Sequence, residues 1–400
     1  MAVAADGLSS PTAPGFVAVW RRECARLWGD RRSRLLLFTL PLLGWLLLLW
    51  LFWPRVPRDL PIIVHDADGS ALSRQLVRYV DATPTARVAA MAVSQDEARD
   101  WMLRGKAYAL LSIPQGMQAS VLAGTPHPVQ LFYNTQWLSA GNAIARDVRQ
   151  AGGTVSLQLA AGRRVLHGQN PRLALAQAYP IATQLHPLFN PSLDYARYLG
   201  LAMVMALLHI FVVVAAADAC GRELRDATAG QWFDAAGGSV MAALIGKLAP
   251  LALWFSVLGA TVLLASLAWL GVQVAGSVAW LLLGWCALVL ACLGLGAFLV
   301  GCTGNLRMAT SVASLIISPA LAFSGLTFPA WSMPAAIALW SALLPLTHYL
   351  SLHVQQVSMG APVSQALWQV LALVPFALLP FLLSPRWRTL LSQPERWGRA

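Results

Sequence analysis

Leu35-Leu-Leu-Phe-Thr-Leu-Pro-Leu-Leu-Gly-Trp-Leu-Leu-Leu-Leu-Trp-Leu-Phe-Trp53 decides the fold class, because these 19 residues carry no charge. About 20 apolar residues cross a bilayer as a helix. The whole chain of 400 residues is 58% hydrophobic and 11% charged, whereas an average soluble domain is about 25% charged. A soluble fold could not bury so much apolar surface. The sequence therefore predicts an α-helical polytopic membrane protein.

A basic segment precedes this run, so a signal peptide is the competing interpretation. Arg31, Arg32 and Arg34 lead directly into the run. The run is longer than the roughly 7 to 15 residues of a signal core, and Trp53-Pro-Arg-Val-Pro57 replaces the expected small-residue cleavage site. We interpret the run, residues 35–53, as an uncleaved first span whose N-terminus stays in the cytoplasm.

Five further apolar segments raise the number of predicted spans to six. They lie at about 199–220, 240–270, 278–302, 308–326 and 367–383, within a region of spans that extends over 199–385. Six spans leave both termini on one side. Basic residues of short loops favour the cytoplasm for that side, and they are Arg222, Arg225, Lys247, Arg307, Arg386, Arg388, Arg396 and Arg399. We predict a multi-pass protein of the bacterial inner membrane with a basic cytoplasmic tail at 386–400.

A polar block at residues 54–198 separates the first two spans and is long enough to fold as a domain. Ser94-Gln-Asp-Glu97 is a capping box that predicts the start of a helix reaching about Arg104. Strands are predicted at 62–65, 88–93, 108–113 and 129–133, and helices at 70–79 and 138–167. The block is therefore predicted to be an α/β domain. Long translocated domains largely escape the charge rule, so we expect it to face the periplasm.

The segment before the first span, residues 1–34, divides into two parts. Residues 1–15 are rich in Ala, Ser, Pro and Gly, and we expect them to be disordered. From Phe16 to Asp30, apolar residues recur at helical spacing, and Arg21, Arg22 and Arg26 take the other face. This pattern predicts an amphipathic helix at the cytoplasmic membrane surface.

The net charge of +11 raises the question of nucleic acid. No basic stripe with interleaved aromatic residues is present, so contact with membrane lipids accounts better for the clustered Arg residues. The five cysteines all fall in or beside predicted spans, which disfavours a disulfide framework or a zinc site.

Chemistry for ATP hydrolysis is missing from the sequence. A phosphate-binding loop has the pattern G-x-x-x-x-G-K-[ST], and neither Lys106 nor Lys247, the two lysines of the chain, lies in one. We therefore expect no cofactor in this chain, with ATP and magnesium bound by a partner. No Gly-x-Ser-x-Gly elbow or zinc-protease helix indicates a membrane hydrolase either.

Three other motifs have an alternative functional interpretation. His209 and Asp218 in the second span would suit a proton pathway, but one His among Leu and Val is more often a packing residue. His348 and His353, expected in an outer loop, lack a third metal ligand. Asp66-Ala-Asp68-Gly-Ser70 resembles the start of a calcium loop without its Glu, so a strand-to-helix turn capped by Ser70 is favoured.

Several segments carry a family resemblance. In the polar block, Ile62–Asp66, Leu72–Tyr79 and Tyr108–Pro114 look like a strand, a helix and a strand, and Phe189-Asn-Pro191 looks like a lead-in to the second span. Arg222-Glu-Leu-Arg-Asp-Ala-Thr-Ala-Gly230 follows that span. Together with the order of spans, these segments resemble the ATP-binding-cassette (ABC) exporter permeases of the second type, ABC-2, in the subgroup with a large periplasmic domain.

The resemblance continues near residues 325–345, with one departure before it. The family has Gly-Thr and then an acidic residue after Arg-Glu, whereas Gln231 and Trp232 stand here. Ser324–Pro329, Met333-Pro334 and Pro345-Leu-Thr347 resemble the outer re-entrant hairpin of the family. The resemblance implies an outer gate at Phe328, Pro329, Met333 and Pro334.

The resemblance also implies partners and a mechanism. It implies a dimer with a second permease copy or paralogue, a cytoplasmic ABC ATPase, and in this subgroup a periplasmic adaptor and outer-membrane channel. The exported compound would be hydrophobic or amphipathic, such as a drug or lipid. Coupling to the ATPase would fall on the surface helix and the loop after the second span, at exposed residues Arg22, Arg26, Arg222, Glu223, Arg225, Asp226, Thr228 and Gly230.

Two alternatives remain open at this point. The charges of these two segments are equally suited to orienting the protein in the membrane, because Arg does both. A membrane-anchored scaffold or sensor with a ligand-binding periplasmic domain is the second alternative, although one span would suffice for that role.

Overall fold

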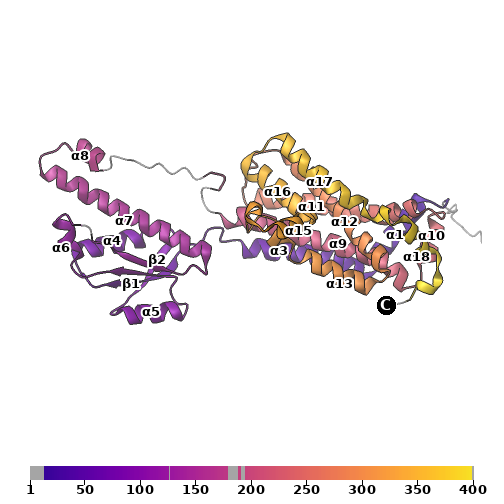
Figure 1. Cartoon of the computed structure of the whole chain (residues 1–400), viewed down its shortest axis with the longest axis horizontal. Coiled ribbons are helices and arrows are strands. Elements are labelled where there is room, and N and C mark those ends of the chain that lie inside the picture. The colour runs from indigo at the N-terminus through magenta and orange to yellow at the C-terminus, as the bar shows by residue number, and fades with distance from the viewer. Residues whose placement is uncertain (1–12, 126, 179–187, 191–193, 399–400) are drawn as a thin grey trace, which may run out of the picture. The chain divides into compact units, whose positions relative to one another are not determined.

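A computed structural model describes residues 13–125, 127–178, 188–190 and 194–398. The chain forms two compact units, one of Met1–Arg55 with Pro187–Ala400 and one of Val56–His186 (Figure 1). Most of the stretch expected to be disordered, Pro191 of the expected lead-in and Arg399 of the expected tail lie outside the described residues.

The Val56–His186 unit is built on a small mixed sheet. Its strands are β1 (Leu60–Asp66), β2 (Ala86–Met91), β3 (Ala109–Ile113) and β4 (Gln130–Tyr133). The sheet order is β2-β1-β3-β4, with β1 parallel to β2 and β3, and β4 antiparallel to β3. The predicted α/β character of this region is confirmed.

Helices cover both faces of this sheet (Figure 1). These are α4 (Ala71–Asp81), α5 (Gln95–Leu103), α6 (Met117–Leu122) and α7 (Leu138–Leu166), and α8 (Pro171–Ala178) packs on α7. One core joins β1 and β3 to α4 and α7, through residues such as Ile62, Leu76 and Ile144. A smaller core joins the other face to α5 through Ile63 and Ala98.

Hydrogen bonds confirm the predicted starts of two helices, α5 and α4. The Ser94 hydroxyl accepts a hydrogen bond from the Glu97 amide at 3.2 Å, and the Glu97 carboxylate accepts one from the Val93 amide at 2.9 Å. Asp66 accepts bonds from the Asp68 and Gly69 amides and from the Ser73 hydroxyl. Ser70 caps α4. The Asp66–Ser70 segment is therefore the favoured strand-to-helix turn.

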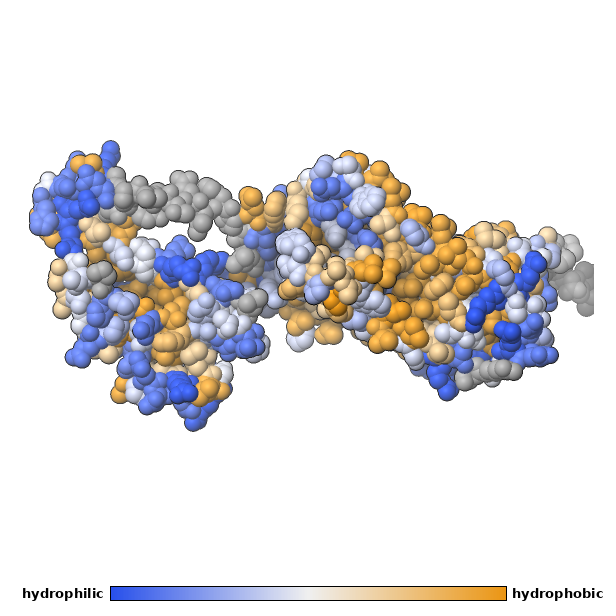
Figure 2. Space-filling view, viewed as in Figure 1, coloured by the Kyte–Doolittle hydropathy of each residue, from blue (hydrophilic) through white to orange (hydrophobic). Residues whose placement is uncertain are grey.

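The other unit is helical, and six of its helical segments are long and apolar enough to cross a membrane. Among the described residues these are Arg31–Leu51, Ala196–Arg225, Val240–Trp269, Val278–Thr303, Leu306–Phe323 and Val363–Leu382. These six candidate spans coincide within a few residues with the six predicted from the sequence. Apolar side chains cover a broad band of this unit, and hydrophilic ones gather at one end (Figure 2).

These spans are made of several helical elements. They are α2 (Arg31–Arg34), α3 (Leu40–Leu51), α9 (Leu201–Arg225), α11 (Val240–Trp269), α12 (Val278–Thr303), α13 (Leu306–Ile317), α14 (Ala320–Phe323) and α17 (Val363–Leu382). π-helical turns occupy Leu35–Thr39 and Ala196–Gly200. The core of the unit lies between α9, α11 and α12, where Trp285 and Phe255 are fully buried.

The region after α14 differs in extent from the predicted hairpin near 325–345. A 3₁₀ turn (Ala330–Ser332) precedes α15 (Ala335–Ala342), and α16 (Pro345–Val354) continues in a π-helical turn to Met359. The two helical segments are bent by 88°, so they form a broken span or a re-entrant loop. His348 and His353 lie within α16 and not in a loop, because Pro345 starts a helix whose apolar residues pack into the core.

The described part of the predicted C-terminal tail is folded. It contains α18 (Ser384–Ser392) and a 3₁₀ turn (Pro394–Arg396). Trp387 is fully buried and packs edge-on against Trp232 of α10 (Ala229–Ala235). Arg386 donates hydrogen bonds to the carbonyls of Gly301 and Cys302 at the C-terminal end of α12. Its charge thus serves as a helix cap.

Candidate functional site

The helix predicted at the membrane surface is present as α1 (Phe16–Gly29), and it packs against α11. Gly246 permits the close approach, because a Cβ there would lie 2.7 Å from the Cβ of Val19. Phe16, Val17 and Trp28 remain exposed on α1, while Val19 and Glu23 are buried. The face of α1 that packs against α11 therefore carries a buried carboxylate, that of Glu23.

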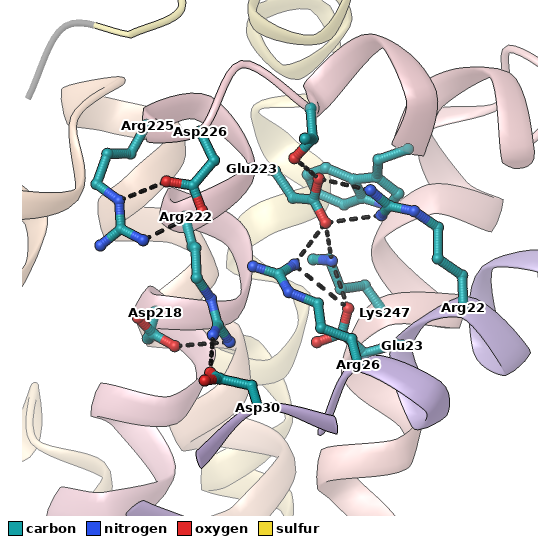
Figure 3. Close-up of polar contacts among 12 residues, drawn as sticks. Arg22, Glu23, Arg26, Asp30, Asp218, Arg222, Glu223, Arg225, Asp226 and Lys247 are labelled. Carbon is teal, nitrogen blue, oxygen red and sulfur yellow. Dashed lines mark hydrogen bonds and ion pairs between the residues drawn. The ribbon is translucent and has the colours of Figure 1, made fainter. Parts of the chain in front are cut away.

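Glu223, on the last turn of α9, is the centre of a buried group of charges (Figure 3). Its Oε1 accepts hydrogen bonds from Arg22 at 2.7 Å, from Arg26 at 2.6 Å and from Lys247 at 2.7 Å. Its Oε2 accepts from Arg22 at 2.9 Å and from the Thr228 hydroxyl. One carboxylate thus joins α1, α9 and α11.

A second carboxylate completes this group, which we call the Glu223 cluster: Arg22, Glu23, Arg26, Glu223 and Lys247. Lys247 Nζ donates to Glu23 Oε2 at 2.5 Å as well as to Glu223. It also lies 4.8 Å from the ring centroid of Trp232, a cation–π distance. Glu23, Glu223 and Lys247 have no solvent exposure, so each depends on the others for compensation of its buried charge.

A neighbouring Arg222 cluster consists of Asp30, Ser33, Asp218 and Arg222. Arg222 donates to Asp30 at 2.6 Å and lies 2.9 Å from Asp218. Asp30 also caps α2. Burial by itself would raise the pKa of Asp30, but hydrogen bonds from the Ser33 hydroxyl, two backbone amides and Arg222 lower it to about 2. Asp30 is therefore ionised at neutral pH and holds α2 to α9.

The expectation that the segment after the second span is an exposed loop is wrong for its first residues. Arg222, Glu223 and Arg225 belong to the last turn of α9, and Arg222 and Glu223 are buried. Charged residues after a span are expected at the protein surface. Here α1 and α11 pack over Glu223. Arg225 and Asp226 do pair in the open at 2.7 Å, and this bond lowers the pKa of Asp226.

Thr228 and Gly230 lie at the start of α10, which follows directly. The Thr228 hydroxyl bonds to Glu223. A Cβ at Gly230 would lie 2.7 Å from the ring of Trp397, so glycine is needed for this contact with the C-terminal segment. Gly398 also donates its amide to the Leu224 carbonyl at 2.9 Å. Of the predicted coupling residues, Arg22, Arg26 and Thr228 thus bond to Glu223, whereas Arg222 bonds within the neighbouring Arg222 cluster.

The residues of the expected outer gate lie around the short 3₁₀ turn that precedes α15. Phe328 is exposed, Met333 is half-buried, and Pro329 and Pro334 precede the 3₁₀ turn and α15. A nearby hollow of about 460 Å³ is lined by Tyr198, Leu326 and Trp331 among others, and by none of the four. The four residues therefore do not line this hollow.

The sequence did not indicate a role for Glu23 or Trp232, and Lys247 was interpreted only as a basic residue flanking the loop after the second span. Lys247 lies seven residues inside α11, in a helix with no other charge. That isolation was the available signal, since a lysine in an apolar span requires a buried partner. The partners lie at positions 23 and 223, and no local pattern links them.

The alternative sites are occupied by structural contacts. Asp218 pairs with Arg222, and the His209 ring contacts the Ala206 carbonyl within its own helix. Over the described residues, no group of three or more His, Cys, Asp or Glu side chains could hold a metal ion.

Comparison with known families gives a match that extends over all six candidate spans. Residues 31–384 match the model of the ABC-2 family transporter proteins. The match includes Arg222, Glu223 and Lys247, and it begins just after α1. A search of curated proteins finds no match. The chain belongs to the ABC-2 transporter family and is the membrane-spanning permease component of an ABC transporter.

Proposed function

We propose that this chain is the permease subunit of an ABC exporter whose ATP is hydrolysed by a separate cytoplasmic subunit. The substrate class is hydrophobic or amphipathic, such as a drug or lipid, taken from the cytoplasm or the inner membrane. The Glu223 cluster is the observation that carries the proposal. It ties a helix outside the spans, α1, to the ends of two spans, α9 and α11.

The cluster gives a physical route for coupling. Breaking a buried ion pair by removing one partner costs about 3 to 5 kcal/mol, so α1 and the ends of α9 and α11 resist separation. An ATPase that moves α1 or α10 would therefore move the spans as well. Exposed groups beside the cluster offer docking contacts, among them Arg21, Asp226 and Asp234.

In this proposal ATP and magnesium bind only the partner subunit. Lys247 is held by two carboxylates, and Lys106 lies 5.6 Å from the Trp101 ring centroid in the other unit. Neither lysine is in a phosphate-binding loop.

The proposed orientation puts both termini in the cytoplasm of a bacterium and residues 54–198 in the periplasm. A second permease copy or paralogue completes the transport path. A periplasmic adaptor and an outer-membrane channel are further proposed partners, and Phe328, Pro329, Met333 and Pro334 are proposed to lie at the outer gate.

The test compares two variants in proteoliposomes that hold this chain and an ABC ATPase encoded beside it. Glu223→Gln removes the central charge, and Glu395→Gln removes an exposed charge of the C-terminal segment. We expect both to insert, and we expect only Glu223→Gln to lower ATP-dependent efflux of a fluorescent amphiphile, by about tenfold or more. Equal efflux by both variants would refute coupling through the cluster. Robust ATP hydrolysis by the isolated chain would refute the division of labour.

A further inference from the structure

The Val56–His186 unit contains a hollow of about 550 Å³ that transport coupling does not use. It lies between α4, α6, α7 and the strands β3 and β4. Pockets for small ligands typically measure about 300 to 1,000 Å³, have mainly apolar walls and carry a few polar groups. The hollow has the right size for a single small molecule.

Most side chains that line the hollow are apolar. Leu72, Leu76 and Leu111 come from the core of the unit, and Val121, Val129, Leu131 and Leu159 are half-buried at the sides. Partly exposed aliphatic side chains that converge on one space leave apolar area open to water, and a ligand with an aliphatic or aromatic body would cover it.

The charged residues of the lining have one sign. Arg149 and Arg163 of α7 line the hollow, and none of its described lining residues is an Asp or Glu. Arg163 donates one hydrogen bond to the Val121 carbonyl at 3.3 Å, which leaves a guanidinium with several further donors. Arg149 is exposed at the edge of the hollow and makes no hydrogen bond or ion pair with any residue that the structure describes. The hollow therefore offers a guanidinium to an anionic head group.

Two glycines inside α7 leave the hollow open. Gly152 and Gly153 line it, one turn from Arg149, and a Cβ added at either would meet nothing within 4 Å. Glycine is the least favourable residue in a helix interior apart from proline. Close packing does not require these two glycines, and their missing side chains leave room for a ligand.

We propose that this hollow binds an amphipathic anion with a single chain, whose carboxylate or phosphate faces Arg149 and whose body lies on the aliphatic walls. The site needs neither an ATPase nor export. Absence of ligand binding would therefore not contradict the coupling proposal, and loss of coupling would not contradict ligand binding.

The test uses the full chain in lipid nanodiscs, with empty nanodiscs subtracted. The probe is 11-(dansylamino)undecanoate, whose fluorescence rises in an apolar site. We expect saturable binding that decanoate and decyl phosphate displace and that uncharged decanol does not. Displacement by decanol as effective as that by decanoate would overturn the assignment of the Arg149 head-group site.

Two matched pairs of variants locate the site. Gly152→Leu should abolish binding, because it fills the hollow while raising helix propensity. Gly162→Leu on the same helix, outside the hollow and also in open space, should leave binding unchanged. Arg149→Gln should weaken binding about tenfold or more, whereas Arg164→Gln, whose arginine bonds to Gln177 instead, should not. Unchanged affinity in Gly152→Leu, or equal losses in both members of a pair, would overturn the proposal.

Discussion

Lys247 Nζ lies 2.7 Å from Oε1 of Glu223, and neither side chain is exposed to solvent. Buried ions are expensive unless paired, because desolvation of each ion costs several kcal/mol. The pair therefore does more than orient the chain in the membrane. It stabilises one arrangement of α9 and α11, and through Glu23 it includes α1 in that arrangement.

Glu223→Gln should destabilise the folded protein by about 3 to 5 kcal/mol, because it leaves Arg22, Arg26 and Lys247 facing one carboxylate. Asp226→Asn removes an exposed pair, which is worth about 0 to 1 kcal/mol. Thermal unfolding in detergent measures both. Similar melting temperatures for the two variants would show that the Glu223 cluster is open to water.

Lys247→Met should be more destabilising alone than together with Glu23→Gln. In the single variant Glu23 loses its close partner, and Arg26 remains only at 3.8 Å. The double variant removes both buried charges, and such apolar or neutral replacements are often close to neutral. A double-mutant cycle on unfolding temperature measures the coupling. Additive losses would contradict a direct contact between Lys247 and Glu23.

Gly259→Ala should destabilise the core of the spans. The added Cβ would overlap the Trp285 indole, which is fully buried and donates to the Phe255 carbonyl at 2.9 Å. Overpacking of this kind costs about 1 to 3 kcal/mol. Gly29→Ala, where a Cβ meets nothing within 4 Å, is the matched control. Equal stability of both variants would refute the packing of Trp285 on Gly259.

Cysteine labelling in intact cells should place the Val56–His186 unit outside the cytoplasm. The five native cysteines are replaced first, and single cysteines are introduced at Ser139 and Ser392, which are both exposed. An impermeant maleimide should modify the cysteine at position 139 and spare the one at position 392. The reverse pattern would show an inverted topology.

The sequence predicted the spans because a bilayer imposes a simple requirement, about 20 apolar residues in a row. The strands and the helix start at Ser94 were likewise predicted from local patterns, and the structure confirms them. The burial of Glu223 could not be predicted in this way. Its charged partners lie 24 to 201 positions away along the chain, and only the packing of α1 on α11 brings them together. His353 was expected in a loop because the apolar segment at 335–359 is interrupted and bent. In a sequence, such an interrupted segment resembles a loop.

The order of Arg222 and Glu223 at the end of α9 restricts how this helix moves. Adjacent residues of a helix are separated by about 100° around its axis, and here one faces Asp30 and Asp218 while the other faces Arg22, Arg26 and Lys247. A turn of α9 about its own axis would bring the Glu223 carboxylate towards two other carboxylates. Torsion at this end is therefore resisted by like-charge repulsion. Under the proposed coupling, we expect a load applied through α1 to reach the spans as tilt or axial translation.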